Sequence, residues 1–161
     1  MAPLVVILMG SKADSEHCQA IADGLGKLGV AAEMRVGSAH KTPEHVLELL
    51  RAYEADSRPK VYITVAGRSN ALSGFVDAQV RAPVIACPPP STNFAGADIY
   101  SSLRMPGGVA PAVVLEPGGA ALLAAKILAL TDPAIAKRIE AMQHDNIEVI
   151  LKDDNAIQTK S

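Results

Sequence analysis

Short apolar runs rich in valine and isoleucine recur along the chain, and each gives way to glycine, proline, serine or asparagine. They lie at Val5–Met9, Val61–Ala66, Val84–Cys87 and Ala112–Leu115. Continuous apolar runs of this length, bounded by turn residues, are typical of strands buried on both faces. Ala31–Val36 is a fifth candidate, and its charged positions predict a place nearer an edge of the sheet.

Between these runs, apolar residues recur at the three- and four-residue spacing of amphipathic helices. The first helical pattern covers Cys18–Leu28, and Gly29 follows it as the predicted left-handed residue that ends the helix. Thr42 and Pro43 predict the N-cap and the first position of a second helix. Asn70–Val80 predicts a weaker third helix.

Two further helices are predicted in the last third of the chain. Gly119–Leu130 is nearly all alanine, leucine and isoleucine, so we expect it to be buried on most sides, in the domain or in a subunit interface. Asp132 and Pro133 begin a final amphipathic helix that runs towards Leu151, and a loose polar tail is expected from Lys152.

The alternation of strands and helices at this spacing is typical of βαβ units with right-handed crossovers and a parallel sheet. We therefore expect an α/β fold: a three-layer sandwich with about five parallel strands, flavodoxin- or Rossmann-like, followed by a long C-terminal helix. A chain of 161 residues, 49% of them hydrophobic, is long enough for one domain with a full core. Residues 1–161 are thus expected to form a single domain, with 152–161 as the polar tail.

Charge, hydrophobic length and cysteine content limit the partners and the cellular compartment that can be expected. The formal net charge is −2 and the basic residues are scattered, which argues against a nucleic-acid partner. The apolar run Leu4–Met9 is too short for a signal peptide or a membrane span, so no membrane partner is expected. Cys18 and Cys87 lack the spacing of a zinc site or a disulfide framework, which favours a reducing, cytoplasmic location.

In a parallel sheet, the loops that follow the strands emerge at one edge, where open α/β sheets bind ligands. The four loops rich in glycine, hydroxyl and charged residues are Gly10-Ser11-Lys12-Ala13-Asp14-Ser15, Gly37-Ser38-Ala39-His40-Lys41, Ala66-Gly67-Arg68-Ser69-Asn70 and Cys87-Pro88-Pro89-Pro90-Ser91-Thr92. In the first loop, Ser11 and the free amides at the start of a helix suit an anion, and Asp14 can accept hydrogen bonds from sugar hydroxyls. The alternative interpretation is that Gly10 makes a tight turn while Asp14 or Ser15 only caps the helix.

In the second loop, Ser38 and Lys41 can hold a phosphate, and His40 can exchange a proton near neutral pH. A lone histidine in a loop is more often a satisfied polar residue than a catalyst, but the three other hydroxyl-bearing loops expected at the same edge favour the catalytic interpretation. The third loop, Gly67–Asn70, offers amides and a guanidinium just before a helix, although a simple turn with a solvated Arg68 would look the same. Because no Gly-x-Gly-x-x-Gly, Walker-type or metal-ligand spacing occurs, neither a redox cofactor nor a catalytic metal is indicated.

The proline run and the remaining histidines can also be explained without a functional role. The rigid run Pro88–Pro90 can form the wall of a pocket or serve as a stiff connector. His17, His45 and His144 lie in predicted helices, where each is expected to be solvated or to make a local hydrogen bond.

Taken together, these loops resemble the aminoimidazole ribonucleotide carboxylase family of purine biosynthesis. The motifs that carry the resemblance are Gly10-Ser11-Lys12-Ala13-Asp14, Ser38-Ala39-His40-Lys41-Thr42-Pro43, Ala66-Gly67-Arg68-Ser69-Asn70 and Ser102-Leu103-Arg104-Met105-Pro106, within a match from Val5 to Leu130. At the third loop, the mutase branch, which rearranges an N-carboxylated nucleotide, carries Gly-Gly-Ala-Ala-His-Leu-Pro-Gly. Here the loop instead resembles the class II branch, which uses free carbon dioxide and in animals is fused to a succinocarboxamide synthetase. Lys41, where the mutase branch has arginine, points the same way.

The resemblance implies reversible carboxylation of 5-aminoimidazole ribonucleotide at C4 by carbon dioxide, giving 4-carboxy-5-aminoimidazole ribonucleotide. That ring carbon is electron-rich, so no metal, biotin or ATP is expected. His40 would carry the C4 proton. The residues that would hold the ribose phosphate are Ser11, Asp14, Ser38 and Lys41; those that would place carbon dioxide or the new carboxylate are Gly67, Arg68, Ser69 and Asn70. A homo-oligomer, tetrameric or octameric, is also implied.

Two alternatives remain. One is the mutase of the same family. The other is a non-catalytic nucleotide- or flavin-binding module, which a flavodoxin-like fold alone would permit. A phosphoacceptor signalling domain would need an acidic cluster around a strand-end aspartate, and these strand ends lack one.

Overall fold

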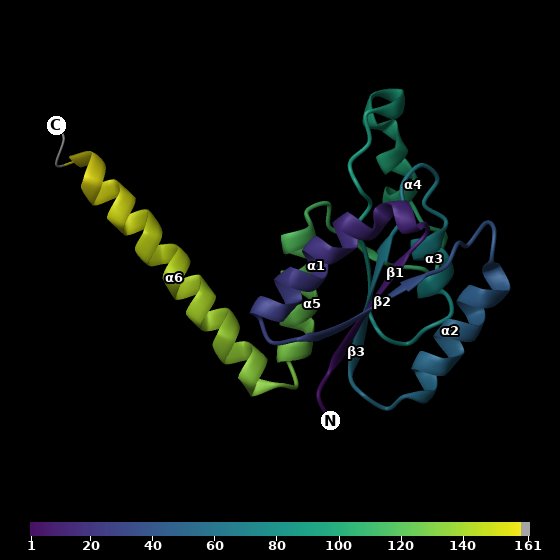
Figure 1. The fold of residues 1–161 in the computed structure, drawn as a ribbon, viewed down its shortest axis with the longest axis horizontal. Coiled ribbons are helices and arrows are strands. Elements are labelled where there is room, and N and C mark those ends of the chain that lie inside the picture. Colours follow the sequence, from purple (N-terminus) through teal and green to yellow (C-terminus); the bar gives the residue numbers. More distant parts are fainter. Residues whose placement is uncertain (159–161) are drawn as a thin grey trace.

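A computed structural model describes residues 1–158 of the chain. Its centre is a five-stranded parallel sheet between two layers of helices, which confirms the predicted fold class (Figure 1). The strands are β1 (Leu4–Met9), β2 (Ala31–Val36), β3 (Lys60–Val65), β4 (Val84–Ala86) and β5 (Ala112–Val113). All five predicted strands are therefore confirmed, with β4 and β5 ending slightly earlier than predicted.

The strand order is β2-β1-β3-β4-β5. Because β1 pairs with β2 on one side and β3 on the other, the chain reverses its winding direction at β1. Such a reversal opens a crevice at the carboxyl ends of the strands, and open α/β sheets bind ligands there. The predicted edge position of β2 is confirmed, and its Glu33 and Arg35 are exposed.

Helices cover both faces of the sheet. Helices α1 (Ser15–Lys27) and α5 (Pro117–Ala129) lie on one face, and α2 (Pro43–Ala55) and α3 (Leu72–Asp77) lie on the other (Figure 1). Successive side chains of a strand point to opposite faces, so β1 supplies both halves of the core. Val5, Ile7 and Met9 pack towards α1 and α5, whereas Leu4, Val6 and Leu8 pack towards α2 and α3.

The turn residues behave largely as their chemistry predicts. Gly29 has φ of 70°, which confirms the left-handed residue after α1. Thr42 is the N-cap residue of α2, but its side chain makes no hydrogen bond to the first turn of that helix. The Asp132 carboxylate accepts a hydrogen bond from the Ala134 amide at 2.9 Å and so caps the last helix.

That last helix, α6 (Pro133–Gln158), extends away from the body of the domain (Figure 1). Ile135 and Ile139 anchor its beginning in the core. The predicted helix end near Leu151 and the loose tail from Lys152 are wrong for 152–158, because this segment lacks glycine and proline and stays helical. Residues 159–161 of the predicted tail lie outside the described part. Within residues 1–158, no helix is long and apolar enough to cross a membrane.

Residues 93–103, called the arm below, protrude beyond the carboxyl edge of the sheet (Figure 1). The arm contains the 3₁₀ segment η2 (Asn93–Ile99) and the short helix α4 (Tyr100–Leu103). Phe94, Ala95 and Gly96 all have positive φ, and the Phe94 side chain is 85% exposed. Neither element is predicted by the sequence pattern, because neither is long enough to show apolar periodicity.

Candidate active site

The loops that follow β1, β2 and β3 enclose a cavity of about 350 Å³ at the carboxyl edge of the sheet. We call it the loop cavity. Its lining residues are Gly10, Ser11, Ala13, Asp14, Ser38, Ala39, His40, Lys41, Ala66, Gly67, Arg68, Ser69 and Leu72. Every site residue expected from the sequence is in this set except Asn70, so three loops far apart in the chain share one concave surface.

The second loop is closed into a turn that presents its tip to the cavity. The Thr42 amide donates to the Ser38 carbonyl oxygen at 2.9 Å, and the Ser38 amide donates to Thr42 Oγ1 at 3.0 Å. The Lys41 amide donates to Ser38 Oγ at 3.2 Å. His40 and Lys41 are exposed at the tip. Sequence reasoning assigned Thr42 only to the helix cap, although its spacing of four residues from Ser38 also fits a closed turn.

In the first loop, Asp14 lies at the cap position that the turn-and-cap alternative gave it, but the hydrogen-bonding side chain belongs to Ser11, which that alternative did not name. Ser11 Oγ accepts a hydrogen bond from the Ala13 amide at 3.2 Å, so this side chain does support the local turn. Asp14 occupies the N-cap position of α1, but its carboxylate makes no hydrogen bond to the first turn of that helix. Instead, Asp14 lines the loop cavity, where its oxygens can accept hydrogen bonds from ligand hydroxyls.

The environment of Asp14 fits such a role. Partial burial raises the pKa of its carboxyl group, while a hydrogen bond from the Ser11 backbone and the nearby His17 oppose this rise. Burial acts in this direction because it removes water that would stabilise the negative charge. Hydroxyl groups of a bound sugar would replace that lost hydration.

The third loop has an unusual backbone. Arg68 has φ of 59°, a left-handed conformation that residues with a Cβ rarely adopt. Gly67 lies against the proline run, since a Cβ at this position would be 3.4 Å from Pro89 Cγ. Asn70 is 4% exposed and binds Ser102 and the Ser73 amide through its side chain. Asn70 therefore supports the loop from behind rather than lining the loop cavity.

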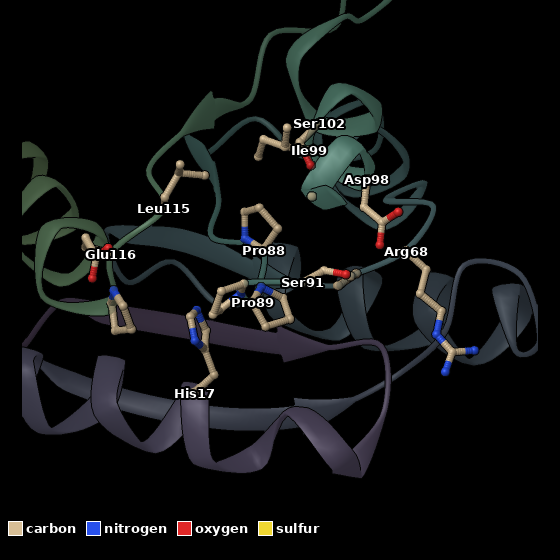
Figure 2. Close-up of a pocket in the computed structure, with 15 residues that line it drawn as sticks. His17, Arg68, Pro88, Pro89, Ser91, Asp98, Ile99, Ser102, Leu115 and Glu116 are labelled. Atoms are coloured by element: carbon tan, nitrogen blue, oxygen red, sulfur yellow. The ribbon is translucent and has the colours of Figure 1, made fainter. Parts of the chain in front are cut away.

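A second cavity, of about 420 Å³, adjoins the first at Ala66, Gly67 and Arg68. We call it the proline cavity, because Pro88–Pro90 form part of its wall, as one of the two interpretations of that run predicts. Figure 2 shows Leu115 and Ile99 above the prolines and His17 reaching towards Pro89 from α1. The cavity is mostly apolar at its centre, with charged groups near its ends.

His17 is a cavity residue that sequence reasoning missed. Its Nε2 lies 3.3 Å from Cys87 Sγ, a contact between residues far apart in the chain. The only sequence signal was its position three residues after Asp14, on the turn of α1 that follows the first loop. Burial lowers the pKa of His17, and the interactions with Cys87, Asp14 and Glu116 oppose this effect.

The lowered pKa of His17 predicts a pH dependence of stability. Below about pH 6.5 an unfolded histidine binds a proton, whereas the folded His17 resists protonation, so this component of stability decreases as the pH falls through that value. We expect a His17→Gln variant to show a smaller loss of stability between pH 7.5 and pH 5.5 than the unmodified protein. Urea unfolding at both pH values measures this difference. His144→Gln, on the exposed part of α6, is the control, and equal losses in all three proteins would contradict the expectation.

Comparison with known proteins agrees with the family resemblance that the loop motifs carry. Residues 4–148 match the family model described as AIR carboxylase. The chain is 57% identical over 158 residues to phosphoribosylaminoimidazole carboxylase of Treponema denticola, a match that covers 98% of this chain and 99% of that protein. It is 52% identical to the protein of the same name from Archaeoglobus fulgidus, over 95% of this chain and 84% of the other.

One further relative and one solved structure extend the comparison. The human bifunctional phosphoribosylaminoimidazole carboxylase/phosphoribosylaminoimidazole succinocarboxamide synthetase is 41% identical over 85% of this chain and 32% of its own length. Among solved structures, the crystal structure of Treponema denticola PurE superimposes with a TM-score of 0.94 at 58% identity, covering 95% of this chain and 97% of that one.

Proposed function

This chain belongs to the AIR carboxylase family and carboxylates aminoimidazole ribonucleotide in purine biosynthesis, and we propose that it uses free carbon dioxide directly. Two sequence features support direct use: the third loop carries Arg68, Ser69 and Asn70 where the mutase branch has a histidine-containing segment, and Lys41 replaces an arginine. The similarity to the human bifunctional protein supports the same branch.

The observation that carries the site assignment is that Ser11, His40 and Arg68 line one cavity although they belong to three different loops. Its volume of about 350 Å³ is of the size that ligand pockets have, roughly 300–1,000 Å³. In the proposed complex, the phosphate lies against the first and second loops, at Ser11 and Lys41. Asp14 accepts hydrogen bonds from the ribose hydroxyls, and the imidazole ring extends towards His40.

The proposed chemistry needs positioning and one proton carrier. The exocyclic amine donates electron density into the imidazole ring, so C4 attacks the carbon of carbon dioxide and forms the new carbon–carbon bond. C4 then carries both its hydrogen and the carboxylate. His40 removes that proton, the electron pair of the C–H bond returns to the ring, and aromaticity is restored. In the reverse direction, His40 returns the proton to C4 before carbon dioxide leaves.

The third loop is proposed to hold carbon dioxide and the carboxylate formed from it. The guanidinium of Arg68 and the amides of Gly67 and Ser69 can stabilise the negative charge that develops on the oxygens of carbon dioxide during attack. Because the ring carbon is already nucleophilic, we propose that the reaction proceeds without metal, biotin or ATP.

One assay tests these proposals together. The purified enzyme is supplied with aminoimidazole ribonucleotide and bicarbonate-derived carbon dioxide, in the presence of a chelator and without ATP, and formation of the carboxylated product is followed. We expect turnover under these conditions. Turnover only with the N-carboxylated nucleotide would identify a mutase, and binding without turnover on either substrate would identify a non-catalytic module.

We also propose that the enzyme is a homo-oligomer, a tetramer or an octamer, located in the cytoplasm. The assembly is supported by α6, whose outer part leaves the domain (Figure 1) and carries a stripe of exposed apolar side chains at spacings of three, four and seven residues. The stripe consists of Ile147, Ile150, Leu151 and Ile157. A second copy of the chain would remove this apolar surface from water. The two free, buried cysteines support a reducing compartment.

Replacing Ile150 with glutamate is expected to reduce the size of the assembly, because a charge would be placed in the centre of the apolar stripe. Light scattering during size-exclusion chromatography measures the mass of the assembly for the variant and the unmodified protein. Lys152→Glu, on the same exposed part of α6 but outside the stripe, is the matched control. An Ile150→Glu protein of unchanged assembly mass would show that α6 is not the interface.

A further inference from the structure

Two neighbouring serines of the arm, Ser101 and Ser102, bind the third loop of the site. Ser101 Oγ accepts a hydrogen bond from the Asn70 amide at 2.9 Å. Its single hydroxyl proton can be donated to either of two carbonyl oxygens within reach, that of Asp98 at 2.8 Å and that of Arg68 at 3.3 Å. Ser102 Oγ, on a side chain that is 2% exposed, accepts from Asn70 Nδ2 at 2.9 Å. We call these two residues the serine pair.

These hydrogen bonds surround the strained point of the loop. Arg68 has φ of 59°, and a left-handed conformation of a residue with a Cβ persists only where the surrounding structure fixes it. The serine pair binds the carbonyl of Arg68 and both the amide and the side chain of Asn70, on either side of Ser69. On the opposite side, Gly67 lies against Pro89. The loop is thus held from two directions.

The held loop separates the two cavities. Arg68 lines both the loop cavity and the proline cavity, so the conformation of its backbone decides which direction its amide and carbonyl face. Relaxation of Arg68 to negative φ would rotate the adjoining peptide groups. Displacements of about 1 Å in groups that position a reacting centre can reduce rates by about 100-fold.

We propose that Ser101 and Ser102 are positioning residues for the carboxylation, which keep Arg68 in its left-handed conformation and thereby aim the third loop at the reacting carbon. This inference rests on the proposed function, in which that loop holds carbon dioxide or the new carboxylate. Ser102 lines the proline cavity, but neither serine lines the loop cavity, so the pair acts on the loop cavity through Arg68 and Asn70. The phosphate end of the nucleotide is held by the first and second loops, which the serine pair does not bind.

The test uses Ser101→Ala and Ser102→Ala, with Ser57→Ala as the control on an exposed turn at the opposite edge of the sheet. For each variant of the pair we expect kcat to fall and the KM for carbon dioxide to rise, together lowering kcat/KM by about 10- to 100-fold. The dissociation constant of the nucleotide should stay close to that of the unmodified enzyme. Ser101→Thr and Ser102→Thr keep the hydroxyl and should recover most of the rate.

A readout independent of turnover covers the case in which the assay gives no activity with carbon dioxide. Hydrogen exchange of the Asn70 amide, which donates to Ser101 Oγ, should become faster in Ser101→Ala and stay unchanged in Ser57→Ala. If the unmodified enzyme turns over only the N-carboxylated nucleotide, the proposed function fails, and kcat on that substrate together with this exchange rate still decides the role of the pair.

A double-mutant cycle tests whether Ser101 acts through Arg68. Glycine adopts positive φ without steric cost, so Arg68→Gly removes the strain that the serine pair has to balance, as well as the guanidinium. We expect the effect of Ser101→Ala to be smaller in the Arg68→Gly background than in the unmodified enzyme. Additive effects, or an Ser101→Ala enzyme with unchanged kcat, carbon dioxide KM and Asn70 exchange, would overturn the proposal.

Discussion

Replacing His40 with asparagine is expected to lower kcat for carboxylation by about 10²- to 10⁴-fold, the contribution that a positioned proton carrier typically makes. Asparagine preserves a hydrogen-bonding group of similar size at the tip of the second loop, but it cannot accept the C4 proton. Because the proposed complex holds the nucleotide at Ser11, Asp14 and Lys41, its dissociation constant should change little. Steady-state rates and calorimetric titration with the nucleotide measure the two quantities separately.

His45→Asn is the matched control, since His45 is exposed on α2 and does not line the loop cavity. It should leave both kcat and the dissociation constant near their original values. A His40→Asn enzyme with an unchanged kcat would exclude His40 as the proton carrier. Loss of nucleotide binding in parallel with the rate would instead assign His40 to binding.

Replacing Ile63 with alanine is expected to lower the free energy of unfolding by about 2–5 kcal/mol, as for other buried isoleucines truncated to alanine. Ile63 is fully buried in β3 and pairs with Ile7 of β1 on one side and Ile85 of β4 on the other. Its side chain packs in the half of the core that lies under α1 and α5. The loss is a large part of the 5–15 kcal/mol that typically stabilises a folded domain. Urea unfolding followed by circular dichroism measures it.

Met34→Ala is the control for this substitution, because Met34 pairs with the same Ile7 from the edge strand β2 but is 41% exposed. Its truncation should cost far less than that of Ile63. Equal losses in the two variants would contradict the expectation that burial of Ile63 sets the size of the effect. Because β3 leads into the loop with Arg68, truncation of Ile63 can also affect activity. The activities of the two variants should therefore be compared at temperatures where both are folded.

Several features of the fold could be predicted from local pattern alone. A run such as Val5–Met9 has no polar position to place on a solvent-facing side, so it predicts a strand buried on both faces. The charged Glu33 and Arg35 predict a strand at the exposed edge of the sheet, because charged side chains are rarely buried on both faces of a strand. Gly29 predicts the end of α1, because a residue without a Cβ adopts positive φ at low cost. Each of these inferences needs information from only a few neighbouring residues.

The loop cavity was also predictable, given one topological rule. Once the strands are parallel, the loops after them must emerge at the same edge, so Ser11, His40 and Arg68 were expected to meet. Local pattern could not separate a ligand-binding role from a structural one. Asp14 and Ser11 show this, since both are good turn residues, yet Ser11 Oγ supports the turn while the Asp14 carboxylate lines the cavity without capping α1.

The sequence by itself therefore determined the α/β class, the buried and edge strands, and the set of loops that line the loop cavity. Only the tertiary structure decided that His17 reaches the proline cavity, that Asn70 faces Ser102 instead of the loop cavity, and that Arg68 adopts a left-handed backbone held by Ser101. The physical reason lies in the range of the interactions. The burial of a position can be inferred from the hydrophobic pattern of the residues close to it in the sequence. A hydrogen bond between residues some thirty positions apart depends instead on how whole elements pack.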